Sequence, residues 1–119
     1  MSSKAFFLLR LNDHVQYLRR VQATLDGKDD FQGSDFHDCK LGKWLYGEGA
    51  AEAQATGAQA KEIFDGLLEP HQRFHEASQQ ALLSRQQGDA AASHGAVTQM
   101  HKLSNTLVDM LLSLDKLSK

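Results

Sequence analysis

The sequence has little cysteine, no long hydrophobic run and no excess of basic charge. A single cysteine, Cys39, cannot form a disulfide within the chain, which excludes a disulfide scaffold. The longest apolar run, Ala5 to Leu9, is too short to cross a bilayer. Thirteen Lys and Arg against fifteen Asp and Glu leave a net charge of −2, so there is no basic surface for nucleic acid or acidic lipid. We therefore expect neither a nucleic-acid partner nor a membrane partner.

Length and composition predict one folded domain over residues 1–119. Hydrophobic residues make up 41% and charged residues 24% of the chain, which is typical of globular proteins and argues against wholesale disorder. A chain of 119 residues is too short to combine a sensor with its own catalytic output domain. The residues from Met1 to Lys4 do not begin a secretory signal, so the cytoplasm is the expected location.

Long helices are predicted because apolar residues recur at spacings of three and four and only one proline interrupts the chain. The first helix is expected from an apolar stripe that runs from Phe7 to Leu25, with Ser2 or Ser3 as the candidate N-cap and Gly27 as its end. Residues 27–38 concentrate glycine and aspartate without a period, which predicts the longest loop.

A short helix is expected next, over 39–46, closed by Gly47 and Gly49. A long helical segment follows, from Ala50 or Thr56 to about residue 87. Pro70 lies inside this segment, where its ring meets a backbone carbonyl, so the helix either kinks or restarts there; we favour a kink.

The last helix is predicted to begin after Gly88, with Asp89 as its N-cap, and to continue to the C-terminus. The expected fold is therefore all-α, an antiparallel four-helix bundle of three long helices and one short helix that carries Cys39. Apolar residues surround most of the last helix near its end, so it needs more than one partner, most simply a second copy in a homodimer. These residues are Leu103, Leu107, Val108, Met110, Leu111, Leu112, Leu114 and Leu117.

Three histidines occupy core positions of the predicted helices. His14 lies in the apolar stripe of the first helix, and His71 and His75 lie in that of the second. Residues four apart share a helix face, so His71 and His75 can direct two nitrogens at one point. A single buried histidine usually just hydrogen-bonds across the core, but three together favour a metal site.

Cys39 can supply a fourth ligand. It lies at a predicted helix start beside Lys40 and Lys43, and both the helix N-terminus and nearby cations favour the thiolate. Three imidazoles and one thiolate suit Zn²⁺ in a closed tetrahedral site, which leaves no position for a catalytic water. An iron site of the hemerythrin kind is the alternative, but the stripes lack the inward carboxylates that it needs.

The same residues resemble a known family. The string from Cys39 to Gly47, Cys-Lys-Leu-Gly-Lys-Trp-Leu-Tyr-Gly, is similar to the signature of the chemoreceptor zinc-binding (CZB) domains. Asp13-His14 and His71-x-x-Phe74-His75 resemble the family's other two blocks in the same order, although Tyr17 stands where many members have Trp.

The resemblance implies a four-helix bundle that binds zinc through His14, Cys39, His71 and His75. It also implies a sensory role in bacterial signalling, because such domains control chemoreceptors and diguanylate cyclases in response to zinc or hypochlorous acid. Family members commonly dimerise. The chain would then be a stand-alone member, a regulatory module without enzyme activity that acts on a separate partner of the chemotaxis or cyclic-di-GMP pathway, with Cys39 as its redox-sensitive residue. A zinc protein with a purely structural role is a further alternative.

The remaining conspicuous residues have simpler interpretations. Gly42 is expected to permit close helix approach and Trp44 to pack in the core. His37, two residues before Cys39, is either solvated or a partner that orients a ligand. Surface positions are expected for the other notable polar residues, which are His94, His101, Lys61, Glu62 and Asp65.

Overall fold

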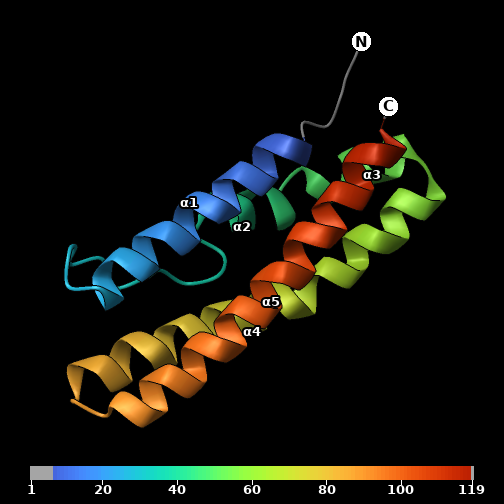
Figure 1. Ribbon diagram of the computed structural model, residues 1–119. Coiled ribbons are helices and arrows are strands. Elements are labelled where there is room, and N and C mark those ends of the chain that lie inside the picture. Colours follow the sequence, from blue (N-terminus) through green and yellow to red (C-terminus); the bar gives the residue numbers. More distant parts are fainter. Residues whose placement is uncertain (1–6, 119) are drawn as a thin grey trace.

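Five helices make up the fold of residues 7–118, the part of the chain that the computed structural model describes (Figure 1). The all-α prediction is confirmed. The helices are α1 (Phe7–Leu25), α2 (Lys40–Leu45), α3 (Gly49–Thr56), α4 (Ala58–Gln86) and α5 (Ala90–Leu117). The long helices α4 and α5 form an antiparallel hairpin along a molecule of 49 × 20 × 19 Å, and α1 packs across α5 beside α2.

The predicted helix ends are confirmed where glycine or a capping side chain marks them. Gly27 and Gly88 have positive φ angles of 79° and 75°, a conformation that favours glycine at the end of a helix. The carboxylate of Asp89 accepts a hydrogen bond from the backbone N–H of Ala92 at 3.0 Å and so caps α5. Ser2 and Ser3, proposed as caps of the first helix, lie outside the described residues.

The short helix expected over 39–46 is α2, but the segment expected from Ala50 or Thr56 to about residue 87 is divided into α3 and α4. Residues 7–118 therefore contain three long and two short helices rather than three and one. Gly49, predicted to close the first short helix, instead begins α3. At Gly57 the backbone has a φ of +146°, which breaks the helical path between α3 and α4. Pro70 does not restart the helix, because α4 is continuous from Ala58 to Gln86.

The core lies where α4 and α5 meet α1 and the two short helices. Trp44 of α2 is 3% exposed and packs edge-on against Phe7 of α1 and Phe64 of α4, while its indole N–H donates to Glu52 of α3 at 3.1 Å. The core role predicted for Trp44 is therefore confirmed. None of the helices in the described residues is both long enough and apolar enough to span a membrane.

Gly42 lets α2 approach the loop before it. A Cβ at this position would overlap the backbone carbonyl of Phe36 and crowd the carbonyl carbon of His37. The close neighbour is thus the loop backbone rather than another helix, which corrects the expected reason for this glycine.

We predict opposite effects of alanine at two helical glycines. Gly42→Ala should lower the free energy of unfolding by about 1–3 kcal/mol because the loop must move away from the new methyl group. Gly95→Ala is the matched control, because a Cβ there meets no atom within 4 Å, and it should raise stability by about 0.5–1 kcal/mol. Urea denaturation measures both changes, and an unchanged midpoint for Gly42→Ala would show that the loop does not pack on α2 as described.

Candidate metal centre

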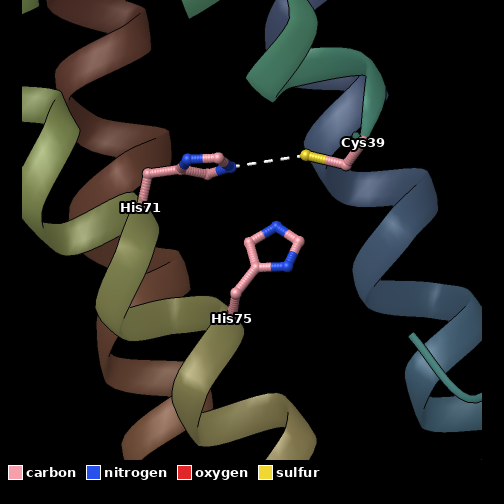
Figure 2. Close-up of side chains that lie close together, drawn as sticks. All are labelled: Cys39, His71 and His75. Carbon is pink, nitrogen blue, oxygen red and sulfur yellow. Dashed lines mark hydrogen bonds between the residues drawn. The ribbon is translucent and has the colours of Figure 1, made fainter. Parts of the chain in front are cut away.

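Three of the four predicted ligands lie together. One ligand atom from each of Cys39, His71 and His75 falls within 4.8 Å of the others. Figure 2 shows the two rings extending from neighbouring turns of α4 toward the sulfur, which lies at the start of α2. His71 and His75 are 0% and 3% exposed, and Cys39 is half-buried. The spacing of four residues thus brings both rings to one point, as the sequence predicts.

The spacing within this cluster suits a small tetrahedral ion. The Sγ atom of Cys39 lies 3.4 Å from Nε2 of His71. In a tetrahedral zinc site, with Zn–S of about 2.3 Å and Zn–N of about 2.0 Å, sulfur and nitrogen ligands lie roughly 3.5 Å apart. The other nitrogen of His71, Nδ1, is buried without a hydrogen-bond partner, so the sulfur is the ring's polar neighbour. The residues present fit zinc.

His75 is oriented by the loop that precedes Cys39. Its Nδ1 lies 3.0 Å from the carbonyl oxygen of Ser34. A carbonyl only accepts hydrogen bonds, so Nδ1 must carry the proton, and Nε2 is left with a free lone pair. Ligating histidines are commonly fixed in this way by a backbone carbonyl.

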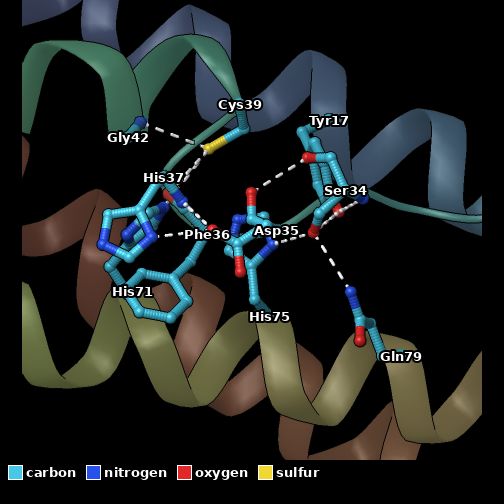
Figure 3. Close-up of polar contacts among 10 residues, drawn as sticks. All are labelled: Tyr17, Ser34, Asp35, Phe36, His37, Cys39, Gly42, His71, His75 and Gln79. Carbon is cyan, nitrogen blue, oxygen red and sulfur yellow. Dashed lines mark hydrogen bonds and ion pairs between the residues drawn. The ribbon is translucent and has the colours of Figure 1, made fainter.

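The peptide of Ser34 is itself held by α1 and α4 (Figure 3). The Ser34 N–H donates to the hydroxyl of Tyr17 at 2.9 Å, and the side-chain amide of Gln79 donates to the Ser34 carbonyl at 3.1 Å. The Tyr17 ring packs on His75 with the centroids 4.7 Å apart. One loop peptide therefore determines both where the His75 ring lies and which nitrogen faces the cluster.

Burial raises the pKa of the Cys39 thiol. Sγ accepts a hydrogen bond from the backbone N–H of Gly42 at 3.2 Å, and this contact lowers the pKa but does not outweigh desolvation. The expectation that the helix start and the lysines favour the thiolate is therefore wrong in net direction. Lys40 and Lys43 are exposed to solvent. The protein alone keeps Cys39 a thiol, and a cation at the cluster is needed to favour the thiolate.

The buried imidazoles are held in the neutral form. Desolvation, with a smaller contribution from His75, lowers the pKa of His14 to about 4. Desolvation and the neighbouring histidines lower the pKa of His71 to about 3. The pKa of His75 is also lowered by burial, although its hydrogen bond to Ser34 opposes the shift. Neutral imidazole is the form that binds a metal ion.

His14 lies near the cluster but is not part of it. Its ring is 2% exposed and packs edge-on against Phe74 of α4, with the centroids 4.6 Å apart. Its Nε2 lies 2.8 Å from the hydroxyl oxygen of Ser104 on α5, a residue that is also buried. The role of His14 as the fourth ligand therefore stays a prediction.

The other histidines lie at the surface. His37 is exposed and pairs through Nδ1 with the carboxylate of Asp35 at 2.7 Å, outside the cluster. His94 and His101 are exposed on α5, as predicted. Lys61 and Asp65 form an ion pair along α4 at 2.7 Å, as expected for a solvated helix face.

A comparison with known protein families shows which family the chain belongs to. The family model described as the chemoreceptor zinc-binding domain matches residues 14–82, which begins at His14 and includes Cys39, His71 and His75. The chain belongs to the CZB family. Comparisons with curated proteins and with solved structures give no match. The resemblance seen in the sequence is thus confirmed, and α5 lies beyond the matched region.

Sequence reasoning missed Ser34 and Ser104 as parts of this site. Ser34 acts through its backbone, and no side-chain pattern can show which carbonyl of a loop will face His75. Ser104 had a visible signal, because it lies four residues after Met100 and three before Leu107 in the apolar stripe of α5. A small hydroxyl in a core stripe indicates a buried polar partner.

We predict that protein freed of metal with EDTA loses stability as the pH falls from 7 to 5. The unfolded chain binds protons on its histidines below a pKa of about 6.5, whereas folded His14 and His71 stay neutral until about pH 4 and 3. Stability is therefore fully present above pH 6.5 and declines below it, by about 2 kcal/mol or more at pH 5. Urea unfolding at several pH values measures this. His14→Gln should flatten the slope and His94→Gln should not; a flat profile for the unmodified protein would contradict the burial described.

Proposed function

We propose that this chain is a zinc-binding sensory module of the cytoplasm without catalytic activity, and that its signal is the occupancy or redox state of the site at Cys39. The convergence of a thiol and two neutral imidazoles on one point carries the proposal. Membership of the CZB family supports zinc as the ion. A cluster of one sulfur and two nitrogens, with no carboxylate in it, favours zinc over the carboxylate-rich iron site of a hemerythrin.

We assign His14 as the fourth ligand. It is a buried histidine close enough to the cluster for electrostatic interaction, because His75 contributes to the lowered pKa of His14 and His14 contributes to that of His71. With four protein ligands the site is closed, which suits regulation or structure rather than hydrolysis. A bound zinc ion supplies positive charge that keeps Cys39 a thiolate and links the start of α2 to α4.

The reactive group of the proposed sensor is the Cys39 sulfur. Hypochlorous acid converts a thiolate to sulfenic acid and is itself reduced to chloride, a two-electron exchange that leaves oxygen on sulfur. A sulfenic acid is a weaker ligand than a thiolate, so the loop and α2 would no longer be tied to His71 and His75. The output partner we propose is a separate protein of the chemotaxis or cyclic-di-GMP pathway, as for the family.

We predict one zinc ion per chain. Alanine at His14, Cys39, His71 or His75 should each weaken zinc binding by more than the roughly 10- to 100-fold that follows loss of a group that merely orients a ligand. His37→Ala, His94→Ala and His101→Ala are the controls and should keep the metal. Elemental analysis and competition with a chromophoric chelator measure both quantities; full zinc affinity in Cys39→Ala or His71→Ala would overturn the proposed site.

We predict that stoichiometric hypochlorous acid modifies Cys39 first and releases zinc. Mass spectrometry with a sulfenic-acid probe identifies the modified residue, and a zinc indicator follows release. If Met100 and Met110 are oxidised while Cys39 stays unmodified, the redox role is wrong and zinc occupancy itself is the signal.

We propose a homodimer formed through α5. Leu107, Leu111 and Leu114 are buried in the core, but Leu112 and Leu117 on the same helix are 40% and 37% exposed. Apolar residues therefore face both the core and solvent near the helix end.

Sedimentation at about 50 µM protein should show a dimer if the dissociation constant is micromolar. Leu112→Lys should weaken the dimer, and a monomer in the unmodified protein would refute the proposed dimer interface.

A further inference from the structure

The hydrogen bond between His14 and Ser104 joins a helix that the CZB family match reaches to a helix that lies outside the match. His14 is the first matched residue, on α1, whereas Ser104 lies on α5, beyond residue 82. Nε2 and the hydroxyl oxygen are 2.8 Å apart, and the two residues are 2% and 3% exposed. A contact this short between two buried polar groups is a well-formed hydrogen bond.

A nitrogen engaged in this way cannot bind a metal at the same time. Each imidazole nitrogen has one bonding direction in the ring plane, and at Nε2 of His14 that direction is taken by Ser104. Neither ring nitrogen of His14 lies within 4.8 Å of all three ligand atoms of Cys39, His71 and His75, so His14 and the cluster have to move closer together before His14 can become a ligand. Nε2 is the outer nitrogen of the ring and reaches further from α1 than Nδ1.

We propose that Ser104 competes with zinc for Nε2 of His14, so that metal binding is coupled to the contact between α1 and α5. This inference rests on the proposed zinc site and identifies Ser104 as the residue that opposes zinc binding by His14. When His14 turns to the cluster, the hydroxyl of Ser104 loses its partner inside the core. The α1–α5 contact is thereby weakened on the helix that we propose for assembly, which connects the site to a surface available to a partner.

The competition determines the direction in which a Ser104 variant changes zinc affinity. Ser104→Ala removes the competing hydroxyl and leaves Nε2 of His14 buried without its partner. Both effects favour the zinc-bound arrangement, and we expect roughly five- to tenfold tighter zinc binding together with lower stability of the EDTA-treated protein. If Ser104 instead oriented His14 while Nδ1 bound zinc, the same change would weaken zinc binding.

The experiment measures zinc affinity by chelator competition and stability by urea unfolding in EDTA, for the unmodified chain, Ser104→Ala and Ser84→Ala. Ser84 is the matched control, because it is a buried serine of α4 whose hydroxyl accepts from Gln80 and touches no histidine. We expect tighter zinc binding in Ser104→Ala alone. Equal or weaker binding in Ser104→Ala than in the unmodified chain would overturn the competition, and failure of the unmodified chain to bind zinc would overturn the proposed function and this inference together.

A second measurement keeps the test decisive if Ser104→Ala folds poorly. Nitrogen-15 chemical shifts of the His14 ring in the unmodified chain report which nitrogen is protonated and which binds metal. Zinc should change the Nε2 signal from that of a hydrogen-bonded nitrogen to that of a metal-bound one. If Nε2 keeps its signal while Nδ1 changes, Ser104 is not a competitor.

Discussion

Three imidazole rings enclosed between α1, α4 and α5 must stay uncharged, and the arrangement of polar groups around them follows from that requirement. A buried imidazolium is strongly disfavoured, which is why the pKa values of His14 and His71 fall to about 4 and 3. Each neutral ring then needs a hydrogen-bond partner or a metal. The polar partner of His14 is the Ser104 hydroxyl, that of His75 is the Ser34 carbonyl, and that of His71 is the Cys39 sulfur.

The loop before α2 gives the site its shape, although it contains little regular structure. Its Ser34 peptide is bound by Tyr17 from α1 and by His75 and Gln79 from α4. Five residues later Cys39 caps α2 with its sulfur, and Gly42 allows that helix to lie directly on the loop backbone. The loop thus connects Cys39 to the group that orients His75, and both residues belong to the proposed zinc site. A change at the Cys39 sulfur would therefore act on the same loop that positions the His75 ring.

Much of this could be predicted from the sequence, for physical reasons that differ from element to element. Helical periodicity placed His14, His71 and His75 in the core because a helix has a regular repeat, and spacing of four brought two of them to one point. The start of the long helix was left open between Ala50 and Thr56, because a glycine at position 57 beside alanine-rich segments is compatible with either a helix or a turn. The raised pKa of Cys39 was also missed, because desolvation depends on packing that no local pattern shows.

The contacts that the sequence could not predict are those made by short side chains and backbone across the bundle. Ser104 and His14 are 90 residues apart, and which polar group faces which depends on how α1 lies across α5. The helix stripes predict which residues are buried but not the register between two helices.

X-ray absorption at the zinc edge of the loaded protein tests most directly the claim that Cys39 and the buried histidines hold the metal. We predict one sulfur neighbour at about 2.3 Å and nitrogen neighbours at about 2.0 Å, with imidazole scattering beyond them. A zinc ion surrounded only by oxygen and nitrogen would contradict this account, because Cys39 would then lie outside the site.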